Sequence, residues 1–278
     1  MRSLETAASR GTAGWPHVRG WRGLLYLACG LICAFLVAPI LVVIPFSFNA
    51  SPYFSFPIEN YSLRWYEAFF GDPQWRRALQ KSLQVAALST VLSTVLGTVA
   101  AFGLRRVSGL AHTIAFGVFL SPLVVPLVVS AVGIFYFFAR LHLIGTVTGV
   151  VLAHSALSVP FVVLTVSAAL SKFDPTLERA GLSLGASPLR VFVTVTLPAI
   201  WTGVFAGAIF AFVTSWDEVV VVIFIATADQ YTLPRLMWAG IRENVNPTLL
   251  AAAVMITAVS LLLMLCAAAA QRSEERTR

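Results

Sequence analysis

The chain has 278 residues, of which 58% are hydrophobic and only 11% are charged, and its mean hydropathy is +0.85. A soluble domain carries about 25% charged residues. The composition therefore excludes a cytosolic enzyme, a disordered tail and a disulfide-stapled secreted module, and it leaves an integral membrane protein. The net charge of +7 is scattered between long apolar runs, which indicates basic loops at a membrane surface and no nucleic-acid interface.

Six uncharged stretches are long enough to cross a bilayer, which takes about 20 apolar residues. These stretches are continuous and do not alternate, so they predict helices and not barrel strands. The expected fold is all-α, a polytopic membrane protein with one transmembrane domain over 24–271 and tails over 1–23 and 272–278. The six predicted spans are 24–46, 82–104, 113–138, 147–170, 199–225 and 249–270.

The distribution of basic residues predicts the orientation of these spans. An even number of spans places both tails on one side. If that side is the cytoplasm, the 19 Lys and Arg residues divide into 12 inside and seven outside, as the positive-inside rule favours. Arg10, Arg19 and Arg22 precede the first span, which is too long for a cleaved signal peptide and is expected to be an uncleaved anchor.

Two loops are long enough to have structure of their own. Segment 47–81, outside, is rich in aromatic residues and could hold a helix lying in the membrane interface. Segment 172–198, inside, has Asp174 as a good N-cap with Pro175 at the first helical position. Gly185 then predicts a break, and Ser187 a second helix start that leads into the fifth span. We expect a helix, a glycine break and a second helix here.

The motifs of catalysis are missing from the sequence. A P-loop needs a lysine after a glycine, whereas Lys81 follows Gln80 and Lys172 follows Ser171. The four histidines lack a metal-binding spacing, no serine lies in a GxSxG elbow, and the three cysteines lie in apolar runs. His154, within the fourth span, is interpreted as hydrogen-bonded between helices, with a proton relay as the alternative. We therefore expect no enzyme activity, metal or cofactor in this chain.

Asp217 and Glu218 interrupt the apolar fifth span. A charge near the membrane centre costs roughly 2.5–3.5 kcal/mol, so such residues face a bundle interior or a wet cavity. One interpretation is an acidic lining for the path of a cationic solute, and the other is a structural hydrogen bond or an interfacial pair beneath a helix break. The prolines within the third and fourth spans break helical hydrogen bonding, either beside a water-filled cavity or as kinks for packing. The close spacing of Gly203 and Gly207 favours a packing role.

The inner loop is the most specific feature. Its stretch from Leu177 to Pro188, followed by Val195-Thr196-Leu197-Pro198, resembles the cytoplasmic coupling loop of binding-protein-dependent ABC importer permeases. That family pattern is Glu-Ala-Ala, three residues, Gly, nine residues and Ile-x-Leu-Pro. With Gly185 as its glycine, the triplet falls on Arg179-Ala180-Gly181, so arginine replaces glutamate and glycine replaces the second alanine. Glu178 lies one residue before the position of the motif glutamate. Because one residue turns a helix by about 100°, its side chain lies on a different face of the helix.

The resemblance covers nearly the whole chain. Residues 61–66, 78–83, 233–242 and 246–248, together with Ser215-Trp216-Asp217-Glu218, are similar to the spermidine/putrescine branch of that family. It implies a permease subunit of the bacterial inner membrane with both termini cytoplasmic. The implied partners are a second permease, two ATP-binding subunits that use the ATP, and an external solute-binding protein, with a polyamine or similar cation as cargo.

The resemblance also implies roles for single residues. Asp217 and Glu218 would line the substrate pathway. The coupling loop to the ATPase would use seven residues, among which the small ones let a partner approach closely: Glu178, Arg179, Ala180, Gly181, Gly185, Leu197 and Pro198. The alternative is a stand-alone secondary transporter or channel driven by an ion gradient, with the acid pair and His154 as a proton relay. A helix–glycine–helix docking loop distinguishes the two, because a secondary carrier has no need of it.

Overall fold

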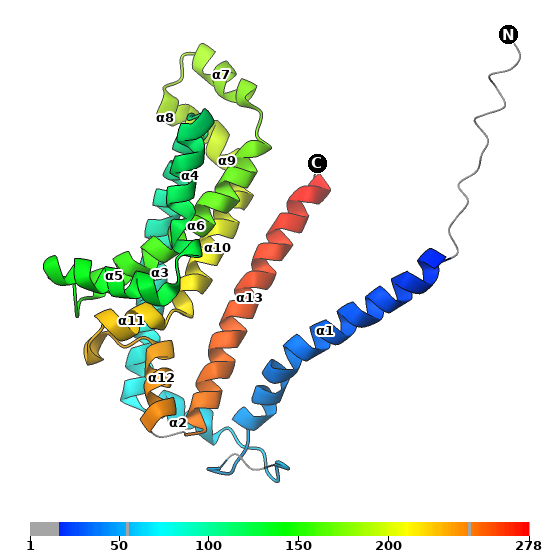
Figure 1. The fold of residues 1–278 in the computed structure, drawn as a ribbon, viewed down its shortest axis with the longest axis vertical. Coiled ribbons are helices and arrows are strands. Elements are labelled where there is room, and N and C mark those ends of the chain that lie inside the picture. The colour runs from blue at the N-terminus through cyan, green and yellow to red at the C-terminus, as the bar shows by residue number, and fades with distance from the viewer. Residues whose placement is uncertain (1–16, 54–55, 244–245, 278) are drawn as a thin grey trace, which may run out of the picture.

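The structure is a computed structural model that describes residues 17–53, 56–243 and 246–277. In these ranges the chain is helical without a strand, apart from an isolated bridge between Asn49 and Tyr61. Most of the predicted tail 1–23, with Arg10, lies outside the described residues. The helical elements (Figure 1) are α1 (His17–Ser47), α2 (Arg64–Gly71), α3 (Pro73–Leu104), α4 (Gly109–Val124), α5 (Leu127–Arg140), α6 (Val147–Ser171), α7 (Pro175–Ser183), α8 (Pro188–Val191), a π-helical turn η1 (Phe192–Thr196), α9 (Leu197–Ala199), α10 (Trp201–Trp216), α11 (Val220–Ile225), a 3-10 turn η2 (Ala228–Gln230), α12 (Leu233–Glu243) and α13 (Thr248–Thr277).

Three helices, α3, α6 and α10, pack against one another at the centre of the molecule. Glycines allow their backbones to come close. A Cβ added at Gly203 would lie 2.5 Å from the Cβ of Ala169, and one added at Gly207 would lie 2.6 Å from Thr165 Oγ1. The packing interpretation of this glycine pair is thus confirmed, and it follows the rule that small residues mediate helix contacts in membranes.

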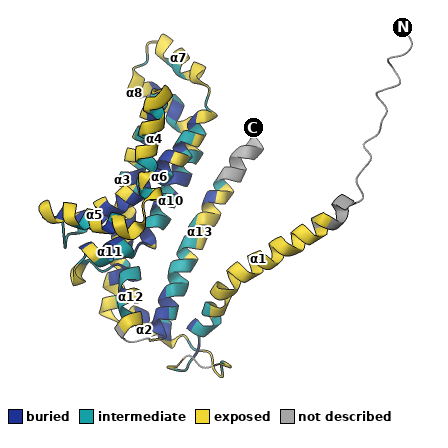
Figure 2. Cartoon of the chain, in the orientation of Figure 1, coloured by how far each residue is buried: buried dark blue, intermediate teal, exposed yellow. Residues whose placement is uncertain are grey.

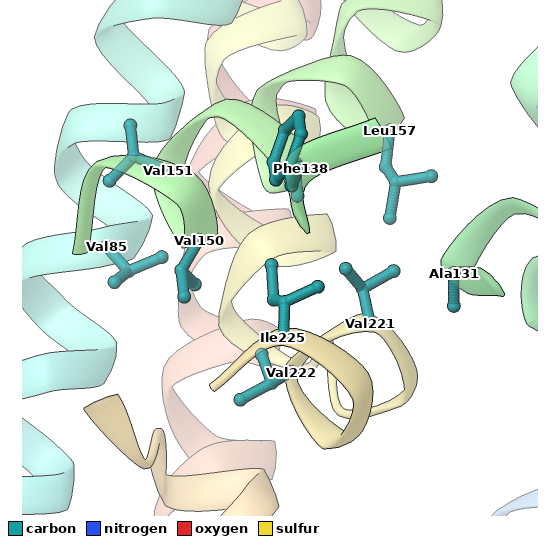
Figure 3. Close-up of a cluster of buried hydrophobic side chains, with 10 residues drawn as sticks. Val85, Ala131, Phe138, Val150, Val151, Leu157, Val221, Val222 and Ile225 are labelled. Carbon is teal, nitrogen blue, oxygen red and sulfur yellow. The ribbon is translucent and has the colours of Figure 1, made fainter. Parts of the chain in front are cut away.

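Hydroxyl groups join the same three helices. Ser89 Oγ on α3 donates to the carbonyl of Val151 on α6 at 3.1 Å, and Ser158 Oγ on α6 donates to the carbonyl of Ala211 on α10 at 3.3 Å. Such bonds satisfy polar groups that would otherwise be unpaired at membrane depth. Figure 3 shows the apolar continuation of this core, a cluster that joins Val85 of α3 and Val150 of α6 with Phe138 of α5 and Ile225 of α11, so that α5 and α11 are held against α3 and α6.

The number of spans agrees with the composition, but two of them are not straight. Among the described residues, four helices (α1, α3, α6 and α13) are long and apolar enough to cross a membrane, and two bent pairs raise the possible number to six. The region predicted as one span, 113–138, is instead α4 and α5 joined at a bend of 103°. Val125 is extended because it precedes Pro126, which has no N–H group to continue the helix.

The predicted fifth span, 199–225, is also interrupted. The helix α10 ends at Trp216, and α11 begins at Val220 after the acid pair. A second bend, of 77°, separates Pro188–Ala199 from Trp201–Trp216. The turn before this bend is π-helical, and the N–H of Leu197 bonds to the carbonyl of Phe192, next to Pro198, which has no N–H group of its own.

The first helix differs from the others in its exposure. Figure 2 shows the middle of α1 exposed, with every residue from Gly23 to Val42 exposed, and α1 packs on α13. The aromatic segment expected in the membrane interface forms α2, yet Trp65 and Phe69 are buried. Phe69 packs with Leu233 and Ala252, so part of this segment faces the protein. The helices α2 and α12 lie at one end of the molecule and α7 at the other (Figure 1).

Candidate functional site

The acid pair lies where α10 stops and α11 starts, and its two members have different surroundings. Glu218 is 8% exposed, and its carboxylate accepts a hydrogen bond of 2.7 Å from the N–H of Val221. The first N–H groups of a helix have no partner within the helix. Glu218 therefore caps α11, as the structural interpretation of the pair requires.

Asp217 is exposed and has no such role at the start of α11. It lines a cavity of about 170 Å³ whose other walls come mainly from α12, including Met237, Trp238 and Ile241. A carboxylate and an aromatic ring that line one space are the two groups that attract an organic cation, by charge and by the cation–π interaction. Of the two acids, Asp217 is the one whose side chain is open to this cavity.

His154 is brought to neither acid. Its ring is 1% exposed and lies 2.8 Å, Nδ1 to Oγ, from Ser215 on α10, whereas its Nε2 has no partner. The histidine thus ties α6 to α10 through a hydroxyl. This geometry agrees with an interhelical hydrogen bond. His154 makes no direct contact with the acid pair through which a proton could be relayed.

The loop between α6 and α10 has the local structure that its sequence predicts. Asp174 caps α7 by accepting from the N–H of Thr176 at 2.9 Å. The Thr176 side chain and N–H lower the pKa of the Asp174 carboxyl, so the cap is charged at neutral pH. The helix ends before Gly185, which has φ +84°, a conformation that glycine adopts without strain. Ser187 then accepts from the N–H of Arg190 and starts α8.

Glu178 points into the molecule, towards its own chain. Its Oε1 lies 3.1 Å from Nη1 of Arg105, the C-cap of α3, and the Thr196 hydroxyl donates to the same oxygen at 2.9 Å. The two charged side chains are 24% and 19% exposed. The carboxylate is therefore engaged within the chain.

The neighbouring residues of α7 divide between the inside and the outside. Arg179 and Ala180 are exposed. Gly181, by contrast, faces α8, because a Cβ added there would lie 3.0 Å from Cγ2 of Val191. The small residue at 181 thus serves contact between α7 and α8, whereas the small residue at 180 is left exposed.

The end of the loop is joined to the core. Leu197 packs against the buried cluster formed by α3, α6 and α10, which includes Val166 and Ile200, and Pro198 is exposed at the bend into α10. Among the residues that the structure describes, no group of three or more His, Cys, Asp or Glu side chains could hold a metal ion.

A family model for binding-protein-dependent transport system inner membrane components matches residues 93–276, which include the loop, the acid pair, α6, α10 and the last part of α3. The chain belongs to this family. It is a permease subunit of an ABC importer and a multi-pass protein of the inner membrane, and permeases of this kind are transport components and not enzymes.

Two similar proteins are polyamine permeases. The putrescine transport system permease protein PotI of Escherichia coli K12 is 32% identical over 249 residues, which cover 87% of each chain. The spermidine/putrescine transport system permease protein PotC of the same organism is 27% identical over 231 residues, 83% of this chain and 87% of that protein. The permease is therefore homologous to polyamine permeases.

Solved structures show the same fold at low sequence identity. A bacterial ABC transporter for import of the acidic polysaccharide alginate superposes with a TM-score of 0.68 at 15% identity, over 91% of this permease and 96% of that chain. The MetNI methionine ABC transporter gives a TM-score of 0.57 at 16% identity, over 71% and 94%. The all-α polytopic fold predicted from the sequence is confirmed.

Three residues gain their roles in these sites only through the fold. Arg105 and Thr196 become partners of Glu178 only through folding, and Trp238 reaches the space beside Asp217 only because α12 folds back on the break. Arg105 counts as one more basic residue of an inner loop in the sequence, and Thr196 as the variable position of the loop motif. The sequence alone therefore indicates the loop and the acid pair, but it does not show which residues lie next to Glu178 and Asp217 in the folded protein.

Proposed function

We propose that segment 172–198 is the surface on which a separate ATP-hydrolysing subunit docks, and that this subunit drives the permease. The observation that carries the proposal is the exposed apolar surface of a loop that stands at one end of the molecule (Figure 1). Leu184 is 88% and Leu189 73% exposed, and no residue of α7 is buried. Exposed apolar residues rimmed by Arg179 and Arg190 form a compact knob of the kind that a partner protein covers.

The orientation follows from the same proposal. The docking loop faces the cytoplasm, where ATP is available, and the 12 to seven division of basic residues agrees with it. Both termini are then cytoplasmic. The permease itself supplies no P-loop lysine, so ATP is used by the partner subunits, and this chain holds no cofactor.

A second permease subunit and an external solute-binding protein complete the proposed importer. The helix α4 has no buried residue although it is strongly apolar, which suits a surface covered by lipid or by another permease. One of the solved structures similar in fold is an alginate transporter in complex with a substrate-bound periplasmic protein. We infer the same kinds of partner here.

The cargo that we propose is a polyamine or a similar cation. It is supported by the exposed carboxylate of Asp217 beside Trp238 and by the homology to putrescine and spermidine permeases. A protonated amine gains Coulomb attraction from the first group and cation–π attraction from the second. Glu218, which is bonded to the backbone of α11, contributes its charge to the surroundings of this path but not an open binding group.

The docking test uses two tryptophan substitutions of exposed alanines. Ala180→Trp places a bulky group on the knob, and we expect uptake of labelled putrescine and co-purification of the ATPase subunit both to fall by about 100-fold, the size of a hot-spot loss in an interface. Ala269→Trp, on the exposed end of α13, is the control that should leave both unchanged. Normal co-purification of the ATPase with the Ala180 variant would exclude this docking surface. Uptake by the purified chain without an ATPase would instead support the stand-alone carrier.

A further inference from the structure

The coupling helix α7 stands apart from the membrane helices. It packs against α8 and η1, and Figure 1 shows it beyond the ends of α4 and α6. A partner that moves α7 can move the core only through the few connections between them. The way α7 is attached therefore decides which helices respond.

Two of the three core helices are joined to α7 along the chain. The helix α6 ends at Ser171 and leads into α7 within four residues, and α10 is reached through α8, η1 and α9. The helix α3 is remote in sequence and reaches α7 through its C-cap, Arg105. The ion pair between Arg105 and Glu178 joins residues 73 positions apart, and it is the one ion pair between side chains within 23–53, 56–242 and 246–270, where the structure describes the side chains.

The surroundings of this ion pair fix its geometry. The Thr196 hydroxyl shares the Glu178 oxygen, and the Arg105 guanidinium lies 5.3 Å from the centre of the Phe173 ring. Nearby, the rings of Phe102 on α3 and Phe192 on η1 are in edge contact at 5.1 Å. A partly buried ion pair with a second donor and an aromatic neighbour is held in one arrangement far better than a solvated surface pair.

We propose that Arg105 is a positioning residue for the coupling of ATP hydrolysis to transport: through Glu178 it makes α3 move with α7, together with α6 and α10. This inference rests on the proposed function, because it assumes that an ATPase moves α7. Without the ion pair the ATPase still docks on the outer face of α7, but α3 no longer follows, and ATP is hydrolysed with less cargo moved.

The test measures ATP hydrolysis and uptake of labelled putrescine in the same proteoliposomes, with the complete importer. Arg105→Gln should lower the ratio of cargo moved to ATP hydrolysed by at least about five-fold, the lower end of typical coupling between sites. Arg106→Gln is the matched control, because Arg106 lies over the Phe102 ring and makes no ion pair. The exchange Arg105→Glu with Glu178→Arg should restore the ratio. An Arg105→Gln ratio equal to that of the control, or no recovery in the exchange, would overturn the proposal.

A second measurement does not depend on the cargo. Spin labels at Gly103 and Ser183, both exposed, report the distance between α3 and α7 in a cysteine-free background. On ATP binding, the distance should stay constant in the parent protein and change by more than about 2 Å in Arg105→Gln, beyond a small helix shift. A constant distance in both would contradict the role of Arg105. Failure of the ATPase to bind the parent chain would overturn the proposed function and this inference together.

Discussion

The chain has two pairs of neighbouring charged residues, Glu178-Arg179 on the loop and Asp217-Glu218 at the helix break. In both pairs one residue is bonded within the chain and the other faces outward. In each pair one carboxylate is bonded inside the chain, to Arg105 and Thr196 in the first case and to the Val221 N–H in the second. The other member is exposed. Two charged residues that are adjacent in sequence therefore need not have the same role.

The reason lies in helix geometry. One residue turns a helix by about 100°, so Glu178 faces α3 while Arg179 faces outward. At the break, the chain leaves the axis of α10, and the backbone N–H groups that open α11 need an acceptor. Glu218 supplies it, and Asp217 is left facing the cavity. Each site therefore has one structural and one open charge.

We expect substitutions of Arg179 and Glu178 to differ most in how strongly they weaken binding of the ATPase subunit. Arg179→Glu reverses the open charge and should weaken binding of the ATPase subunit roughly 100-fold, because like charges across an interface cost several kcal/mol. Glu178→Gln should leave this affinity within about two-fold and lower only the coupling ratio, because its contacts are internal. Equal losses of affinity in the two variants would show that both side chains face the partner.

We expect a smaller difference between substitutions of Asp217 and Glu218, in the uptake of putrescine. Asp217→Asn should lower uptake of putrescine about ten-fold, the loss of roughly 1.4 kcal/mol of charge attraction. Glu218→Gln keeps an oxygen that can accept from Val221 and should reduce uptake less than about two-fold. Uptake of labelled putrescine into cells that contain the whole importer measures both. If the Glu218 variant loses more than the Asp217 variant, the assignment of open and structural acid is reversed.

The smallest effect concerns stability. Glu218→Ala leaves the N–H of Val221 without its acceptor and should reduce the free energy of unfolding by about 1–3 kcal/mol. Asp217→Ala, at an exposed position, should change it by less than about 0.5 kcal/mol. Thermal unfolding in detergent compares the two. A lower Tm for the Asp217 variant than for the Glu218 variant would contradict the capping role.

Much of the fold could be predicted because apolar length and helix caps are local signals. The long helices α1, α3, α6 and α13 cover four predicted spans, and Asp174 and Ser187 start the helices that their residue types favour. The bend at Pro126 was less predictable, because Pro122 remains inside α4 while Pro126 ends it. A proline removes one hydrogen bond in either case, and tertiary packing decides whether the helix continues.

The partners within each site could not be predicted. Arg105 and Glu178 are 73 residues apart, and Trp238 comes to Asp217 through α12, which folds against the break. Gly181 shows the same limit: its small size indicates a close approach, but only the fold shows that Val191 of the same chain is the neighbour. Residue type predicts that a contact exists, and topology decides with what.

Site-specific cross-linking tests the central claim most directly, namely that the outer face of α7 meets an ATPase while Glu178 faces the permease itself. Cysteines are placed singly at positions 180 and 178 after Cys29, Cys33 and Cys266 are replaced by serine, and the assembled importer is treated with a short cross-linker. We expect a cross-link to the ATPase subunit from position 180 and none from position 178. A cross-link from position 178, with or without one from position 180, would contradict this arrangement, as would the lack of a cross-link from position 180 in an importer that transports normally.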